Sequence, residues 1–276
     1  MNLHEPRSIS PLVICRSFWK NRNLIYQMTM REIIGRYKGS IFGLTWSFFN
    51  PLLLLSIYTF VFSVVFKMRW DIISEQSKFD FALILFVGLI FHTFIADILT
   101  RAPTQISSNV NYVKKVIFPL EILTVINVLA ALFHTIISFI VLIVVMTILS
   151  KPPTLTAFLI PLTVLPIVPL ILGLGWITSS LGVFVKDIPH FIGIIVTTLL
   201  FLCPIFYPLS ALPEEFRRII YLNPLTLPIE ETRAILLHGQ LPDWKSITIY
   251  FLVSLIISII GFLFFQKTRN GFNDVL

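Results

Sequence analysis

The side chains of this chain that could transfer protons form no recognisable catalytic pair. The groups that an integral membrane glycosyl or acyl transferase for lipid-linked substrates could use as acid or base are Asp97, Glu230, Glu231 and His238. Glu230 and Glu231 are adjacent and would diverge by about 100° around a helix, so they cannot form a facing dyad. The sequence pairs none of these groups. We therefore predict no catalytic residue and keep the transferase as an alternative.

The sequence also has no motif for nucleotide or metal chemistry. The phosphate-binding pattern G-x-x-x-x-G-K-S/T is absent, as are H-E-x-x-H, a nucleophile elbow and a Cys/His cluster. The two cysteines, Cys15 and Cys203, suggest neither a disulfide nor a metal site. We expect no cofactor or metal in this chain. If ATP drives its function, ATP and Mg²⁺ bind to a separate partner subunit.

Composition places the chain among polytopic membrane proteins. Its residues are 56% hydrophobic and only 13% charged, with a mean hydropathy of +0.89, whereas about a quarter of the residues of a soluble domain are charged. Uncharged stretches recur at the length that a spanning helix needs, roughly 20 residues. We predict a single all-α transmembrane domain over 1–276, with six spanning helices at 43–66, 81–99, 122–149, 157–185, 191–208 and 247–265.

Lysine and arginine are distributed unevenly between the two sides of this arrangement. One side carries 13 of them, including seven in residues 1–42, and the other carries eight. Because cytoplasmic loops are enriched in Lys and Arg, both termini are predicted to be cytoplasmic. The net charge of +7 fits this bias and an attraction to anionic membrane lipids, and it requires no nucleic-acid partner. The ionisable residues within the spans are His92, Asp97 and His134, and this scarcity argues against an ion-coupled carrier.

The stretch 31–51, REIIGRYKGSIFGLTWSFFNP, contains the predicted entry into the membrane. Basic residues occupy its first half, and the first uncharged span begins in its second half. The stretch resembles the type-2 ATP-binding-cassette exporter permeases, and within them the branch that exports lipid-linked polysaccharide such as O-antigen or teichoic acid. The matching residues are Arg31, Glu32, Arg36, Tyr37, Ser40, Gly43, Trp46, Asn50 and Pro51.

The resemblance implies contacts with a separate ATPase on the cytoplasmic side. Residues 1–42 would include an amphipathic interface helix beside the ATPase. The loop 101–121, which matches the family pattern N-x-x-Y-V-K-K-x-x-F-P, would contain the coupling helix. A plain lipid anchor and a solvated connector are the alternatives. The residues implied in ATPase coupling are Arg31, Glu32, Asn109, Tyr112, Val113, Lys114 and Lys115.

Residues 212–241 are too polar to span the bilayer and too apolar for a free loop. They resemble the family's two short re-entrant helices between spans five and six. Such helices would cap a cavity, because non-helical backbone at membrane depth needs protein or water around it. An amphipathic hairpin on the outer surface is the alternative. The outer gate would comprise Tyr221, Asn223, Glu230 and Glu231.

The first span is rich in aromatic residues, and others follow at the proline-broken end of the fifth. Sugars present flat C–H faces that stack on such rings, and a polymer in motion needs weak, repeated contacts. We therefore predict a substrate path lined by Trp46, Phe49, Tyr58, Phe206 and Tyr207. Ordinary packing and lipid contact are the alternative.

The resemblance covers nearly the whole chain and implies an assembly. A homodimer would join two copies of a cytoplasmic ATP-binding-cassette ATPase in the bacterial inner membrane. A pore at the dimer interface would move a lipid-linked polysaccharide, O-antigen before others, from the cytoplasmic to the outer leaflet. Teichoic acid, capsular polymer and drugs remain alternative substrates.

Overall fold

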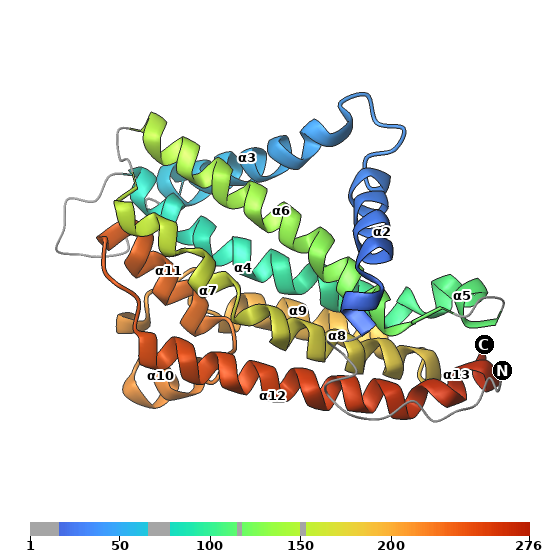
Figure 1. Cartoon of the computed structure of the whole chain (residues 1–276). Coiled ribbons are helices and arrows are strands. Elements are labelled where there is room, and N and C mark those ends of the chain that lie inside the picture. The colour runs from blue at the N-terminus through green and yellow to red at the C-terminus, as the bar shows by residue number, and fades with distance from the viewer. Residues whose placement is uncertain (1–16, 66–77, 115–117, 150–152) are drawn as a thin grey trace.

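A computed structural model describes residues 17–65, 78–114, 118–149 and 153–276, and all regular structure in these ranges is helical. The predicted all-α class is confirmed. Near one end of the bundle lie α2 (Arg22–Gly35), α5 (Val110–Lys114) and α13 (Phe272–Val275), and toward the other lie α10 (Glu214–Tyr221) and α11 (Thr226–His238) (Figure 1).

Within the described residues, five segments are long and apolar enough to cross a membrane, where six were predicted. They are Gly43–Phe62, Phe81–Gln105, Glu121–Ile148, Leu155–Phe184 and Trp244–Val275. The remaining predicted span, 191–208, corresponds to the apolar helix α9 (Ile188–Leu202) of 15 residues. At about 22 Å it is shorter than a hydrocarbon core of roughly 30 Å. Cys203 is extended, as the residue before a proline prefers, so α9 ends six residues before the predicted boundary.

Several spans are built from more than one helical piece. The first comprises the 3-10 turn η1 (Gly43–Thr45), α3 (Trp46–Tyr58) and the π-helical η2 (Thr59–Val65). The second and third are α4 (Lys78–Gln105) and α6 (Glu121–Ile148), and the last is α12 (Trp244–Thr268). The fourth is interrupted around two prolines, which cannot donate a helix hydrogen bond, into η4 (Leu155–Leu159), α7 (Pro161–Val164) and α8 (Ile167–Phe184). Short 3-10 turns are η3 (Ser107–Asn109), η5 (Leu209–Ala211) and η6 (Arg269–Gly271).

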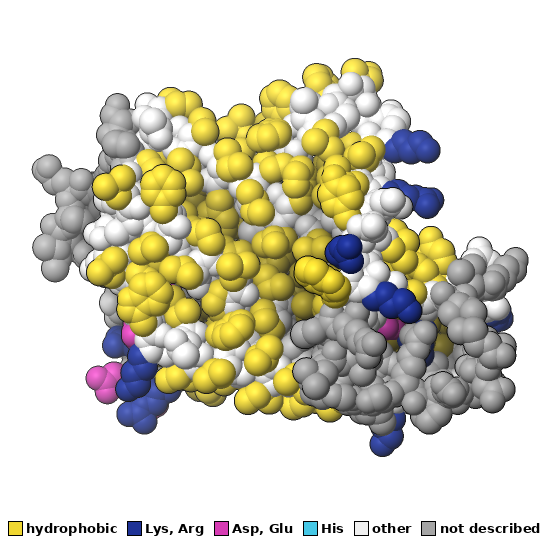
Figure 2. Space-filling model, viewed as in Figure 1, with side chains coloured by type: hydrophobic (Ala, Val, Ile, Leu, Met, Phe, Trp, Pro, Cys, Tyr) yellow, Lys and Arg dark blue, Asp and Glu magenta, His cyan; other side chains and the backbone are white. Residues whose placement is uncertain are grey.

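Helix α4 lies at the centre of the bundle. In the most apolar 18-residue stretch of this span, 78% of the residues are buried, whereas the corresponding shares are 17% in the first span and 22% in the last. Helix α4 packs against α6, α8, α9, α11 and α3. Apolar side chains cover much of the bundle face seen in Figure 2, and Lys and Arg lie toward its two ends. The bundle therefore presents an apolar surface between polar ends, as a bilayer requires.

Helices α8 and α12 approach each other closely through glycine. A Cβ added at Gly261 would lie 2.2 Å from the carbonyl oxygen of Gly173, and one at Gly173 would lie 2.5 Å from the carbonyl oxygen of Ile257. Beside this contact the buried Trp176 packs edge-on against Phe262, with ring centroids 5.3 Å apart. Small residues that let two backbones approach are typical of helix contacts in membranes.

We predict that Gly261→Ala destabilises the chain by about 1–3 kcal/mol, because the added methyl group forces two packed helices apart. Unfolding in detergent, followed by loss of helical signal, measures this change. Gly193→Ala is the matched control, since a Cβ there meets nothing within 4 Å. Equal stability of the two variants would contradict the packing described.

Candidate functional site

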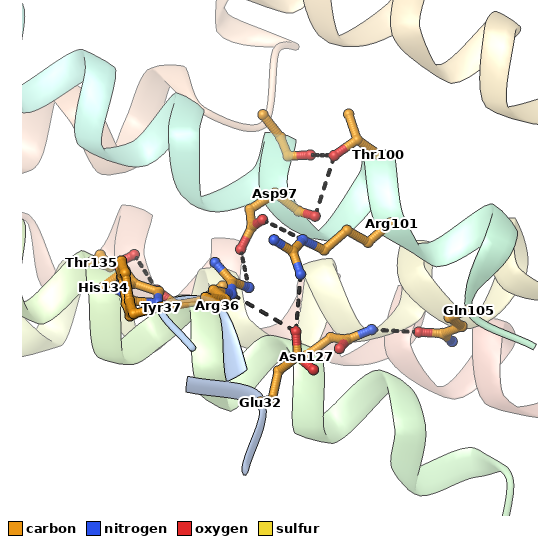
Figure 3. A network of polar contacts seen from close by, with 12 residues as sticks. Glu32, Arg36, Tyr37, Asp97, Thr100, Arg101, Gln105, Asn127, His134 and Thr135 are labelled. Carbon is orange, nitrogen blue, oxygen red and sulfur yellow. Dashed lines mark hydrogen bonds and ion pairs between the residues drawn. The ribbon is translucent and has the colours of Figure 1, made fainter. Parts of the chain in front are cut away.

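Four charged side chains join α2 to α4 in a closed ring (Figure 3). Arg36 at the end of α2 donates from Nη2 to Asp97 Oδ2 at 2.7 Å, and Arg101 donates from Nε to Asp97 Oδ1 at 2.8 Å. Arg101 Nη1 in turn donates to Glu32 Oε1 at 2.9 Å, and Arg36 Nε lies 3.8 Å from that same oxygen. Acids and bases alternate around the ring, so its formal charge is zero.

Helical spacing places the members of this ring. Glu32 and Arg36 are four residues apart at the end of α2, and Asp97 and Arg101 are four apart on α4, so each pair shares one helix face. The side chains of Arg36 and Asp97 are only 17% and 20% exposed. Moving α2 away from α4 would separate these partners and leave partly buried charges uncompensated. The ring therefore fixes α2 against α4. Asp97 is thus a structural anchor between two arginines.

The ring continues into polar contacts with α6. The Tyr37 hydroxyl lies 3.5 Å from His134 Nδ1, and the two rings meet edge-on with centroids 5.8 Å apart. Burial raises the pKa of Tyr37, which favours the protonated hydroxyl. Further along α4, Gln105 donates to Thr124 at 2.6 Å and accepts from Asn127 at 2.8 Å. Helices α2, α4 and α6 are therefore held together at one end of the bundle.

A groove of about 440 Å³ opens beside the ring, between α3, α4 and α6. Arg36 and Asp97 lie at one end of it, and Tyr58 and Phe86 at the other. Of the five residues predicted to line the substrate path, only Tyr58 lines this groove.

Three of the other predicted path residues, Trp46, Phe49 and Phe206, lie in two aromatic clusters. Trp46 and Phe49 are exposed at the start of α3 and make edge-on contacts with each other and with Phe42. Tyr58 stacks on Phe62 with ring centroids 6.2 Å apart, and the ring centroids of Phe206 and Phe62 are 5.6 Å apart. The Tyr207 hydroxyl donates to the carbonyl oxygen of Phe201 at 3.0 Å. Phe62 links Tyr58 to Phe206, a role the sequence reasoning missed.

The predicted coupling residues are divided between α2 and the loop after α4. Arg31 is exposed on α2, whereas Glu32 belongs to the ring. In the loop, Asn109 donates to the carbonyl oxygen of Gln105 at 2.8 Å, and Tyr112 stacks on Phe118 with centroids 4.5 Å apart. Val113 packs on the adjoining apolar cluster, Lys114 donates to the carbonyl oxygen of Leu276, and Lys115 lies outside the described residues.

A second ion pair ties this loop to the last segment of the chain. Arg269 donates from Nη1 to Glu121 Oε2 at 2.8 Å and from Nη2 to the carbonyl oxygen of Phe118 at 2.9 Å. The Glu121 side chain is 2% exposed and also accepts from Ser17 at 3.1 Å, and its carbonyl oxygen accepts from Trp176 Nε1 at 3.0 Å. The loop is thus braced against α8 and the turn η6.

At the opposite end, Arg233 of α11 is the buried polar anchor, and the sequence reasoning missed it. Its guanidinium donates to Glu230 at 2.7 Å and to the carbonyl oxygens of Ile84 and Pro204 at 3.1 and 2.6 Å. The i,i+3 spacing of Glu230 and Arg233 in an apolar helix is the signal that could have revealed it. Among the predicted gate residues, Glu230 is therefore paired and Tyr221 is exposed. Glu231 accepts from the Asp243 amide at 2.9 Å, and Asn223 accepts from the Leu225 amide at 3.0 Å.

Comparison with known proteins identifies the family. Residues 23–237 match the profile of the family described as "ABC-2 type transporter". The chain belongs to this family. Two O-antigen export system permease proteins RfbA of Klebsiella pneumoniae are 28% and 27% identical over 255 residues, which is 92% of this chain and 95% of each relative. An O-antigen export system permease protein RfbA of Myxococcus xanthus is 27% identical over 263 residues, 95% of this chain and 98% of the relative.

Membership of the ABC-2 family gives the chain its general role. It is a multi-pass membrane permease, a transport subunit without an ATPase domain, and it works with an ATP-binding-cassette subunit. The resemblance noted in the sequence is thereby confirmed at the level of the family. The membrane transferase considered above is set aside, and Asp97, one of its candidate acids, is engaged by two arginines.

We predict that Arg36→Ala and Asp97→Ala are energetically coupled by about 1–3 kcal/mol, because each removes the other's partner. A double-mutant cycle on unfolding in detergent measures the coupling. Arg22→Ala combined with Asp97→Ala is the control, since Arg22 packs over the Trp19 ring and donates to the Trp19 carbonyl oxygen. Additive effects of the Arg36 and Asp97 changes would show that the ring does not hold α2 to α4.

Proposed function

We propose that this chain is the membrane-spanning subunit of an ATP-driven exporter of lipid-linked polysaccharide, with O-antigen as its substrate. The observation that carries the proposal is the likeness to O-antigen export permeases over at least 92% of this chain and 95% of each relative. The exporter comprises a homodimer of this chain in the bacterial inner membrane and two ATPase subunits, which bind ATP and Mg²⁺. The lipid-linked polymer passes from the cytoplasmic to the outer leaflet.

In this proposal the end of the bundle with α2, α5 and α13 faces the cytoplasm. The excess of Lys and Arg assigned to that side of the sequence supports this orientation. The loop from η3 to Phe118 then faces the ATPase. Its support is mechanical, because the Tyr112–Phe118 stack and the Arg269–Glu121 pair brace the loop against α8. A displacement of this loop by the ATPase therefore moves the spanning helices with it.

Reconstitution tests the function directly. The chain and its partner ATPase are placed in liposomes with radiolabelled lipid-linked O-antigen, and the labelled polymer that reaches the opposite leaflet is measured with an impermeant glycosidase. We expect transfer with ATP and none with a hydrolysis-deficient ATPase. Transfer of teichoic acid, capsular polymer or a drug in place of O-antigen would support the corresponding alternative substrate and overturn this one.

We predict that Val113→Pro uncouples ATP hydrolysis from export, because proline disrupts the short helix α5 by about 3 kcal/mol or more. ATPase activity and polymer transfer are measured together in the same liposomes. Hydrolysis should continue while transfer falls about tenfold or more. Val113→Ala, which keeps the helix, is the control. Normal transfer by the proline variant would rule out α5 as the coupling helix.

A labelling experiment checks the orientation. Ser107 in η3 and Ser210 in η5 are both exposed and belong to opposite ends of the chain's topology. We expect an impermeant maleimide added outside intact spheroplasts to label Ser210→Cys and to leave Ser107→Cys unlabelled until the membrane is opened. The reverse pattern would place α2, α5 and α13 outside.

A further inference from the structure

The groove between α3, α4 and α6 contains polar side chains that have no hydrogen-bond partner in the described part of the chain. Asn50 of α3 and Thr93 of α4 are exposed and line it, together with Tyr58. Within the described residues, no hydrogen bond joins any of these three side chains to another group. Polar side chains on spanning helices are costly against lipid and belong in a water-filled or ligand-filled space. The groove is such a space.

Helical periodicity directs three faces into this groove. On α4 the lining positions are 86, 89, 90, 92, 93, 94, 96, 97 and 100, and on α6 they are 131, 134, 135 and 138. On α3 they are 47, 50, 51, 54 and 58. The α3 and α6 sets follow the three-and-four spacing of one helix face, and α4 contributes a wider face. Thr100 follows Phe86 by 14 positions, a rise of about 21 Å along α4, so the groove extends over most of the roughly 30 Å hydrocarbon core.

The chemistry of the lining favours a neutral, hydroxylated ligand. Arg36 and Asp97 at one end are paired with each other, so the groove offers no surplus positive charge to a phosphate. A hydrocarbon chain would leave the amide of Asn50 and the hydroxyl of Thr93 without partners. Sugars provide both donors and acceptors for these groups, and their C–H faces can pack on the Tyr58 ring.

We propose that this groove binds the saccharide part of the exported molecule, with Asn50 and Thr93 bonding sugar hydroxyls and Tyr58 packing on a sugar ring. This inference rests on the proposed function and deepens it. It places the saccharide between three helices of one protomer, away from Trp46 and Phe49, which are exposed at the start of α3 and do not line the groove. The contacts are few and uncharged, so a polymer can exchange them unit by unit.

Photo-crosslinking shows whether the saccharide binds in the groove or on the exposed aromatic residues at the start of α3. A benzophenone amino acid is placed at position 50 or 93 in the full exporter, which is reconstituted with radiolabelled lipid-linked O-antigen and illuminated. We expect radiolabel on the protein from positions 50 and 93. Positions 49 and 140 are the controls, because Phe49 and Ile140 are exposed on α3 and α6 outside the groove. We expect at least about tenfold less label from both.

Each outcome of the experiment decides a separate claim. If the wild-type exporter transfers polymer but positions 50 and 93 take no label, or take less than position 49, the groove is not the saccharide site and the proposed function stands. If the wild-type exporter transfers no O-antigen, the proposed function fails and this inference fails with it.

Variants of Thr93 give a second, independent readout. Thr93→Trp fills the groove, and we expect transfer to fall about tenfold or more while assembly with the ATPase persists. Thr93→Val keeps the shape and removes one hydrogen-bonding group, which corresponds to a loss of about two- to tenfold. Ile140→Trp is the matched control and should transfer at the wild-type rate. Should Thr93→Trp not assemble, Thr93→Val carries the test, and a wild-type rate for it together with Asn50→Ala would overturn the proposal.

Discussion

Charge cannot be left uncompensated where these helices pack, and this constraint organises the end of the bundle that holds α2. Arg36 and Asp97 are both largely buried, and each is acceptable there only because the other is in place. The ring that they form with Glu32 and Arg101 joins α2 to α4, and α4 packs against α3, α6, α8, α9 and α11. A displacement of α2 is therefore passed to the centre of the bundle and to the groove beside it.

Two further arginines hold the helices together at the ends of the bundle. Arg269 holds Glu121 and the carbonyl oxygen of Phe118, which fixes the loop before α6. Arg233 holds the carbonyl oxygens of Ile84 and Pro204, which fixes α11 to the ends of α4 and α9. In both places a guanidinium satisfies several acceptors at once, a geometry that lysine cannot reproduce. The α3 span, largely exposed, is the part of the structure least constrained by these anchors.

The sequence predicted the helical spans well because their signal is local. Stretches without charge located α4, α6 and α12, and the boundary predicted at residue 122 for the third span lies one residue from its start at Glu121. The length of α9 was overestimated because apolar residues continue past Pro204 after the helix has ended.

Contacts between distant residues were the part that sequence could not supply. Glu32 and Arg36 are recognisable as an i,i+4 pair, yet nothing in the sequence says that Asp97, 61 positions after Arg36, completes their ring. The aromatic path was predicted from the number of aromatic residues in the first span. Which of their rings face the same cavity depends on how each helix is rotated about its axis. Rotation directs Asn50 and Thr93 into the groove and leaves Trp46 and Phe49 out of it.

The claim that the ring makes α2 and α4 one moving unit is tested most directly by a distance measurement during the ATP cycle. Spin labels at Ile34 of α2 and Thr104 of α4, both exposed, report their separation in the assembled exporter. We expect one narrow distance distribution, unchanged between nucleotide-free and ATP-bound states, and a broad one in the Asp97→Asn variant. A separation that shifts with ATP in the unaltered ring would contradict this claim.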